Sequence, residues 1–393
     1  MPSHASPPPK HPRINYRQHD YKPHRPSPLR LLRRPYVYLP AILLLLYLYH
    51  PSLPFTTPHL PTHTPSLNHK NIDWTRYAYS QYATNSAYLC NALMVFSTLH
   101  SLSSKPHRLL FYPQEWDLDI SSTKDRDSQL LVKARDEYNV KLMPVEVPQA
   151  GNDAWNSSFV KFFAWGETQY HRVLHLDSDI TMLKHLDELF LLPRAPVAML
   201  RAYWELPTTR KLTSLFVLLE PSAQELERLL AAADPKNRKE SDYDMEILNR
   251  FYGDSAMILP HRQYGLLSGE FRTNDHSNFL GNTWESWNPD RALAEASLVH
   301  FSDWPLPKPW IMWPRNLIGE VVPRCEGDGL AEVGKKGGCR NREVWMGLYD
   351  GFRKRRKEVC KLLSVPAPEW PPRNVTGLGK AEEKAGVLVG DGG

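Results

Sequence analysis

The stretch HRVLHLDSD, residues 171–179, decides the fold that we expect for this chain. The apolar residues before Asp177 predict a short buried strand, because such runs are typical of parallel sheets and this one is too short for a helix. Asp177 and Asp179 follow at the carboxyl end of the strand, where open α/β sheets bind their ligands. Alternate residues of an extended segment project to the same side, so both carboxylates can face one ion.

The two acids allow three interpretations. Carboxylate oxygens suit a hard divalent cation such as Mn²⁺ or Mg²⁺, which would hold a phosphorylated ligand. A turn with two solvated acids explains the stretch alone equally well. Residues 173–181 also fit the nucleophile motif of haloacid-dehalogenase-type phosphatases, with Asp177 attacking phosphorus and Asp179 as acid and base. That motif normally opens its domain, however, and here several expected strands precede it.

Length and composition limit the classes of protein. A chain of 393 residues is long enough for one large α/β domain or two smaller ones. The net charge of +5 is modest and lies largely in the N-terminal arm, so no nucleic-acid partner is expected. Four cysteines are too few for a disulfide scaffold, and none forms the CxxC pair typical of zinc sites.

The N-terminal part predicts a membrane anchor. Residues 1–34 are rich in Pro, His and Arg and predict a disordered cytosolic arm. Residues 35–50 are apolar and uncharged with Tyr at both ends, which predicts a single-pass type II signal anchor; a cleaved signal peptide is the alternative. The span is shorter than the roughly 20 residues of a typical membrane helix, which favours the thin membranes of the early secretory pathway. Residues 51–70 predict a luminal Pro/Thr-rich stem.

Residues 71–365 predict one catalytic domain, followed by a disordered tail over 366–393. Strands alternate with helices, which predicts a mostly parallel sheet with helices on both faces. The expected strands are 77–83, 107–112, 140–147, 173–176, 197–202, 215–219 and 255–259. The expected helices are 86–101, 123–138, 157–169, 185–191 and 221–233, and residues 243–251 are expected to be a helix or a turn. The region 260–313 is expected to be loop-like.

Further features follow from the expected topology. Cys90, inside the helix 86–101, is expected to be a buried thiol, whereas Cys325 and Cys339 are expected to close a disulfide loop in a lumen. The basic run 353–357 predicts a solvated helix face. Sequons at Asn156 and Asn374 become glycosylation sites if the domain is luminal.

Five segments in order resemble the glycogenin-like glycosyltransferases of family 8. The matching segments, besides the DxD of Asp177-Ser178-Asp179, are RYAYSQYATNSAY (76–88), DELF (187–190), DMEILN (244–249) and HFSDWPLPKPW (300–310). The resemblance covers about residues 72–313 and is strongest to fungal Golgi N-acetylglucosaminyltransferases of this group. It implies a single Rossmann-like, nucleotide-sugar-binding domain of the GT-A type.

The resemblance also implies roles for individual residues. A metal ion, Mn²⁺ or Mg²⁺, would be held by Asp177, Asp179 and His300. Asp244 would orient the acceptor or stabilise the oxocarbenium-like state, although a helix N-cap explains it equally well. Lys161 would contribute to catalysis and reach the donor. The residues implied in donor binding are Tyr82, Thr84, Asn85, Tyr88, Lys161, Asp177, Ser178 and Lys308.

The resulting prediction is a metal-dependent, retaining glycosyltransferase of the Golgi membrane with a luminal catalytic domain. It would move a sugar, first of all GlcNAc, from a UDP-sugar to a glycan or glycoprotein acceptor. The metal would neutralise charge that develops on the leaving diphosphate. The alternatives are the phosphatase with Asp177 as nucleophile and a non-catalytic sugar-binding protein.

Overall fold

A computed structural model describes most of the chain after residue 71. The described residues are 72–121, 125–147, 154–206, 208–303, 306–312, 321–323, 339–361 and 365–366. The chain divides into two compact units, Met1–Asn71 and Ile72–Gly393. The expected arm, anchor and stem, and the expected tail from residue 367 on, lie outside the described residues, as does Asn374. No helix in the described part is long and apolar enough to cross a membrane.

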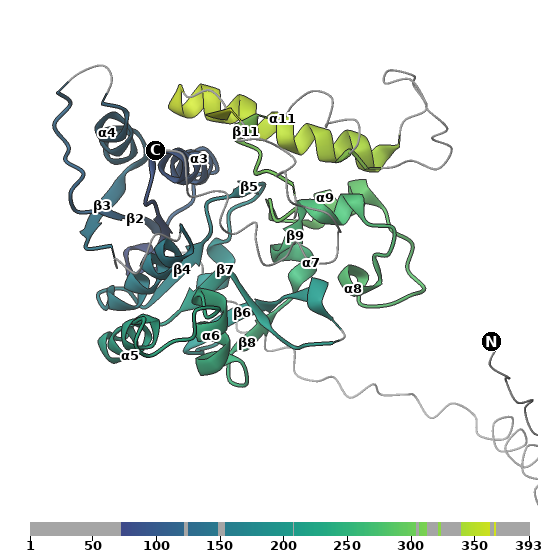
Figure 1. Cartoon of the computed structure of the whole chain (residues 1–393), viewed down its shortest axis with the longest axis horizontal. Coiled ribbons are helices and arrows are strands. Elements are labelled where there is room, and N and C mark those ends of the chain that lie inside the picture. Colours follow the sequence, from purple (N-terminus) through teal and green to yellow (C-terminus); the bar gives the residue numbers. More distant parts are fainter. Residues whose placement is uncertain are drawn as a thin grey trace, which may run out of the picture. The chain divides into compact units, whose positions relative to one another are not determined.

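A seven-stranded sheet forms the centre of the described second unit (Figure 1), in the order β3-β2-β1-β4-β7-β6-β8. Its strands are β1 (Tyr77–Tyr82), β2 (His107–Pro113), β3 (Val140–Val145), β4 (Arg172–Leu176), β6 (Val197–Arg201), β7 (Leu212–Leu219) and β8 (Met257–Leu259). The pairs among β3, β2, β1 and β4 are parallel, whereas β7 runs antiparallel to both β4 and β6. The expectation of a mostly parallel sheet is therefore confirmed.

Helices cover both faces of this sheet, as expected (Figure 1). One face packs against α3 (Ser86–Ser101) and α4 (Arg126–Tyr138). The other packs against the 3-10 segment η4 (Ala154–Gly166), α5 (Ala223–Ala233) and α6 (Asp244–Tyr252). Strands β4 and β7 are buried at every position, which explains their nearly continuous apolar sequences.

Some expected elements differ in kind or extent. The helix expected over 157–169 is the 3-10 segment η4, and the one over 185–191 shortens to η5 (Asp187–Leu191). The expectation of a loop over 260–313 is wrong, because short elements occupy much of it. These are β9 (Leu266–Leu267), β10 (Leu298–His300), β11 (Ile311–Met312), α7 (His261–Tyr264), α8 (Ser277–Leu280), α9 (Pro289–Glu295) and η7 (Ser268–Arg272). Strand β10 lies between β9 and β5 (Ile180–Met182) in a small second sheet.

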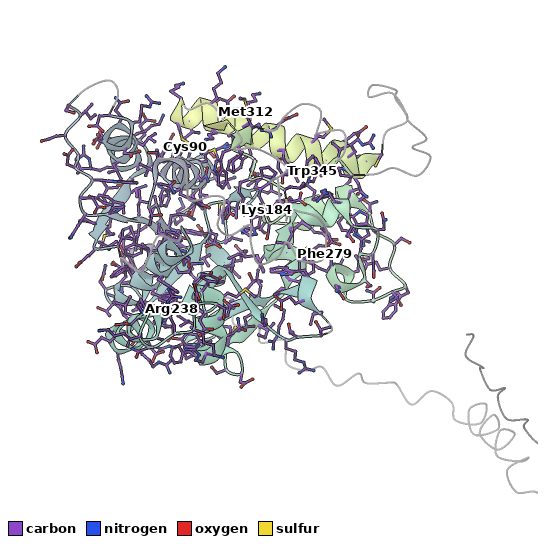
Figure 2. All side chains as sticks on the ribbon, in the orientation of Figure 1. Cys90, Lys184, Arg238, Phe279, Met312 and Trp345 are labelled. Carbon is purple, nitrogen blue, oxygen red and sulfur yellow. A yellow bond between two sulfur atoms is a disulfide. The ribbon has the colours of Figure 1, made fainter. Side chains whose placement is uncertain are left out.

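The helix α11 (Arg340–Cys360) corrects two expectations from the sequence. Cys90 is not a thiol, because it forms a disulfide with Cys360 at the end of α11. The basic run is not simply solvated either, because Arg356 within it is only 2% exposed. The buried side of α11 includes Trp345, which is labelled in Figure 2 together with Cys90. Cys339 is disulfide-bonded too, and Cys325, the partner expected for it, lies outside the described residues.

Candidate active site

The small second sheet brings His300 to the DxD acids. Strand β5 begins directly after Asp179 and pairs antiparallel with β10, with Ile180 opposite His300. The Phe301 amide donates to the Asp179 carbonyl oxygen at 2.9 Å, which continues this pairing by one residue. As a result, residues 121 positions apart lie side by side, and His300 Nε2 is 3.1 Å from Asp179 Oδ1.

Asp177, Asp179 and His300 form a group that fits a divalent cation. Each offers one ligand atom, and these atoms lie within 4.8 Å of one another. The Nδ1 atom of His300 is buried and has no hydrogen-bond partner among the described residues. Two carboxylates and an imidazole supply the mixed oxygen and nitrogen ligation that suits Mn²⁺, and carboxylates also suit Mg²⁺.

Lys308 lies on the other side of Asp179. Its ammonium donates to Asp179 Oδ2 at 2.6 Å and to the Phe301 carbonyl oxygen at 2.7 Å. Burial opposes ionisation of Asp179, but Lys308 and His300 beside it outweigh burial and hold its pKa well below the usual range. Asp179 is therefore a carboxylate at neutral pH, the form that binds a metal ion.

Lys161, from η4, links Asp177 to Asp244. Its Nζ lies 3.0 Å from Asp177 Oδ1 and 2.5 Å from Asp244 Oδ2, and it donates to the Ser214 carbonyl oxygen at 3.3 Å. Burial lowers the pKa of Lys161, but the two carboxylates outweigh burial and raise it. The lysine is 2% exposed, donates to Asp177 and to the Ser214 carbonyl oxygen, and forms an ion pair with Asp244, so it fixes both acids in place.

The two acids that Lys161 links differ in their electrostatics. Burial raises the pKa of Asp177, and the charges of Asp179 and Asp244 raise it further. The charge of Lys161 acts in the opposite direction but does not outweigh them. Burial also acts on Asp244, but Lys161 and hydrogen bonds from neighbouring serines lower its pKa. Asp244 is the first residue of α6, whose N-cap is Tyr243, so the N-cap explanation of Asp244 is wrong.

The tyrosines expected at the donor site face the DxD acids. Burial raises the pKa of Tyr82 and of Tyr88, and the charges of Asp177 and Asp179 raise both further, which places the phenols in the field of this pair. The ring of Tyr88 meets Trp310 edge to face at 5.4 Å between centroids. Both tyrosines are half-buried at the site.

The other expected donor residues surround these tyrosines. Asn85 is the N-cap of α3, where its side chain accepts from the Tyr88 amide at 3.1 Å. Thr84 lies in the loop that joins β1 to α3 and is half-buried. Ser178, between the two acids, is 5% exposed. The DxD, Lys161, Lys308 and both tyrosines therefore come together around one point.

His175 is a site residue that the sequence reasoning missed. It is fully buried, with Nδ1 3.0 Å from Ser80 Oγ and its ring stacked on Tyr82 at 5.7 Å between centroids. Burial and the charge of Lys161 lower its pKa well below the usual value, so the ring is neutral. The sequence offered one signal for His175: it is a polar residue in an otherwise apolar strand, two positions before Asp177 and therefore on the same side of the strand.

Asp187, in the DELF segment, has a structural role. Its carboxylate is buried and accepts from Tyr79 Oη at 2.7 Å, Ser104 Oγ at 2.7 Å and the Lys105 amide at 2.9 Å. These bonds join the segment that follows β5 to β1 and to the loop before β2. Asp187 therefore supports the DxD region without being part of the candidate metal group.

Comparisons with known proteins point to one group of fungal enzymes. No family model matches the chain. It is 50% identical over 318 residues to glucose N-acetyltransferase 1 of Aspergillus fumigatus, covering 78% of this chain and 82% of that protein. The Gibberella zeae protein of the same name is 45% identical over 76% of this chain and 66% of its own length. The Saccharomyces cerevisiae protein of this name is 23% identical over 75% of this chain and 83% of its own length.

Solved glycosyltransferase structures are also similar to the chain. The galactosyltransferase LgtC, in complex with donor and acceptor sugar analogues, matches with a TM-score of 0.42 and 11% identity over 70% of this chain and 95% of its own. The apo form of GlyE from Streptococcus pneumoniae matches with a TM-score of 0.43 and 17% identity, over 70% of this chain and 60% of its own.

Proposed function

Because the chain belongs to the glucose N-acetyltransferase 1 family and is a glycosyltransferase, we propose that it moves GlcNAc from UDP-GlcNAc to a glycan or glycoprotein acceptor. The name of its relatives joins glucose to an N-acetyl group, which agrees with this sugar. We assign the domain to the GT-A type and to family 8 on the five sequence segments described above. The interpretations as a phosphatase and as a non-catalytic sugar-binding protein are set aside.

The single observation that carries this proposal is the grouping of Asp177, Asp179 and His300. We propose that these residues hold Mn²⁺ or Mg²⁺. When bound, the metal would offset negative charge on the diphosphate as the glycosidic bond to the leaving group breaks. Lys308, beside Asp179, would add a positive charge for the same phosphates.

The rest of the donor is assigned to the residues around the acids. Tyr82, Tyr88 and the Thr84-Asn85 turn at the start of α3 would contact the uridine. The position of the two tyrosines supports this assignment, since the charges of Asp177 and Asp179 raise the pKa of both phenols. Their raised pKa keeps both phenols protonated, so each can donate a hydrogen bond.

The acceptor side is assigned to Asp244. We propose retention of the anomeric configuration, with Asp244 orienting the acceptor hydroxyl or stabilising positive charge on the sugar ring. Its lowered pKa keeps it ionised, as either role requires. Lys161 would act on both substrates through Asp177 and Asp244, holding the two carboxylates in one geometry.

We further propose that the enzyme is a single-pass type II protein of the Golgi membrane, anchored by residues 35–50, with its catalytic domain in the lumen. The Cys90–Cys360 disulfide supports an oxidising compartment, because such bonds are rare in the cytosol. Fractionation of cells that express the full chain tests this location. Recovery in the cytosolic fraction would contradict it.

A screen of UDP-sugars tests the proposed reaction. The full chain, purified in detergent, is incubated with each UDP-sugar and Mn²⁺, and release of UDP is measured. We expect the fastest release from UDP-GlcNAc and its loss in EDTA, with recovery when Mn²⁺ is restored. Full activity in EDTA would contradict the metal role, and preference for another UDP-sugar would change the assigned donor.

A further inference from the structure

The C-terminal helix α11 contacts the loop that follows His300 and carries Lys308. Asp303, in this loop, is buried and accepts from Trp345 Nε1 at 2.5 Å and from Tyr349 Oη at 3.3 Å, both on α11. Further along α11, Arg353 Nε donates to the Pro309 carbonyl oxygen at 2.9 Å. These contacts from α11 therefore hold the segment around Lys308 at Asp303 and at Pro309.

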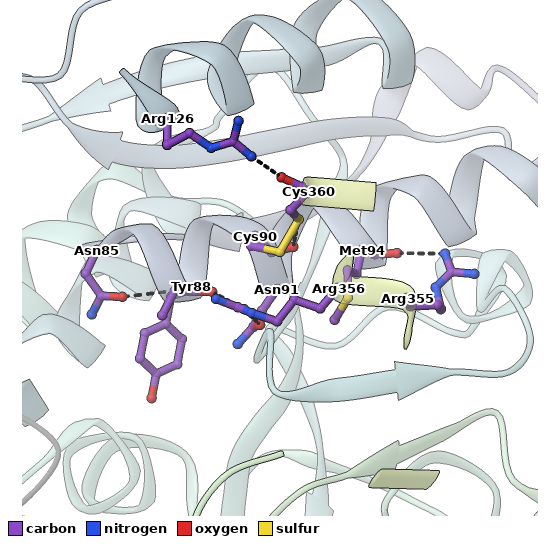
Figure 3. Close-up of a disulfide and its surroundings, with 10 residues drawn as sticks. Asn85, Tyr88, Cys90, Asn91, Met94, Arg126, Arg355, Arg356 and Cys360 are labelled. Atoms are coloured by element: carbon purple, nitrogen blue, oxygen red, sulfur yellow. Dashed lines mark hydrogen bonds between the residues drawn. A yellow bond between two sulfur atoms is a disulfide. The ribbon is translucent and has the colours of Figure 1, made fainter. Parts of the chain in front are cut away.

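The last part of α11 contacts the donor end of the site (Figure 3). Arg356 Nη1 donates to the Ala87 carbonyl oxygen at 2.9 Å and to Asn91 Oδ1 at 2.7 Å, in the first two turns of α3. Ala87 directly precedes Tyr88, so the guanidinium holds α3 beside a residue assigned to the uridine. The Cys90–Cys360 disulfide joins the two helices at the same place.

The middle of α11 connects these two contacts through aromatic rings. Phe352 packs against Trp310 at 5.8 Å between centroids, and Trp310 in turn meets Tyr88 at 5.4 Å. Phe352 also meets Phe301, the residue after His300, at 5.0 Å. One helix face therefore touches the neighbours of both the nucleotide residues and the metal residues.

Stability alone does not account for Arg356. Its side chain is buried, and no carboxylate among the described residues forms an ion pair with it. Burial lowers its pKa to about 10, so it keeps its charge at neutral pH. A buried cation without an anionic partner is unfavourable, and an apolar side chain of similar size would fill the same space at lower cost. The two directed bonds to α3 are what an apolar side chain would lose.

We infer that α11 sets the distance between the nucleotide end and the metal end of the donor site, and that Arg356 is the positioning residue at the nucleotide end. This inference rests on the proposed function, because it takes Asn85 and Tyr88 as uridine contacts. A site held in its binding geometry before the donor arrives loses less freedom on binding. Loss of Arg356 would therefore weaken donor binding while the reacting groups stay intact.

The test compares Arg356→Met with Arg355→Met in the full chain. Arg355 is the matched control, because it lies on the same helix and also bonds α3, but farther from Tyr88, at the Met94 carbonyl oxygen and at Thr98. Michaelis constants for UDP-GlcNAc, kcat, the dissociation constant for UDP with Mn²⁺ and thermal midpoints are measured for each. Arg356→Met should raise KM and the UDP dissociation constant about tenfold, equal to a loss of about 1.4 kcal/mol, with kcat within about twofold.

Arg356→Lys completes the comparison, and it replaces Arg356→Met as the test variant if Arg356→Met does not fold. Its ammonium can reach one of the two acceptors, so its KM should fall between those of the wild type and Arg356→Met. Equal changes in KM for the Arg355 and Arg356 variants, or a change in thermal midpoint alone, would overturn the role of Arg356. A wild-type chain that binds no UDP would instead overturn the proposed function.

Discussion

Asp179 is the residue on which the proposed chemistry depends most. It contacts His300 and Lys308 through different carboxylate oxygens, at 3.1 and 2.6 Å. It is 7% exposed and yet ionised, because the Lys308 ammonium and the His300 ring on its two sides offset the loss of water. This position would let one carboxylate bind the proposed metal and orient the lysine that would meet the diphosphate.

Asp179→Asn keeps the shape of this side chain and removes its charge. We expect UDP release from UDP-GlcNAc to fall about a hundredfold or more, because metal stabilisation of developing charge contributes several kcal/mol. Initial rates with excess Mn²⁺ measure this. Asp136→Asn is the control, since Asp136 is exposed and pairs only with its neighbour Arg135 among the described residues. Wild-type rates in Asp179→Asn would contradict the metal role.

Lys161 allows a prediction about stability at the same site. Lys161→Met leaves the buried Asp244 and the half-buried Asp177 without their shared cation, so we expect the free energy of unfolding to fall by about 3–5 kcal/mol. Urea denaturation of the full chain measures it. Removing one acid as well, in Lys161→Met with Asp244→Leu, should restore part of the loss, because the groups interact directly. Strictly additive losses would contradict the proposed linkage.

At the scale of elements, short strands and one long helix assemble the site. Strands β5 and β10 have only three residues each, but their pairing places His300 beside Asp179. Helix α11 then fixes the loop beyond His300 and the start of α3. Residues of α11 therefore shape a site whose proposed donor contacts begin at β1.

The disulfide between α3 and α11 should be a major source of stability. It joins cysteines separated by 270 positions and so restricts a large part of the unfolded chain. We expect Cys90→Ala with Cys360→Ala to lower the free energy of unfolding by about 2–4 kcal/mol, measured by urea denaturation. Non-reducing peptide mass spectrometry of the wild type is the control. A free thiol at Cys90 there would contradict the bond.

At the scale of the whole molecule, the proposed topology places the enzyme's second unit in the lumen. We expect Asn156 to carry an N-glycan, because its sequon would then face the glycosylation machinery. Glycosidase treatment should lower the mass of the wild type, and Asn156→Gln should remove that change. In intact microsomes, added protease should remove an N-terminal tag and spare the second unit. Digestion of the second unit would contradict this topology.

The sequence by itself determined the elements whose signals are local. The apolar period and the Asn85 N-cap predicted α3 with its observed bounds, and the apolar run before Asp177 predicted β4. The DxD and Lys308 were also found as candidates, because their residue types and order resemble a known motif set. These features depend on a few neighbouring residues, which is why the sequence alone reveals them.

Only the tertiary structure decided which distant residues meet. The pairing of β5 with β10, the burial of Arg356 and the Cys90–Cys360 bond have no local signal: strands of three residues have no period, and spacing does not reveal which cysteines pair. Such contacts form because burying both sides of the sheet brings remote segments together. The site therefore follows from packing as much as from its motif.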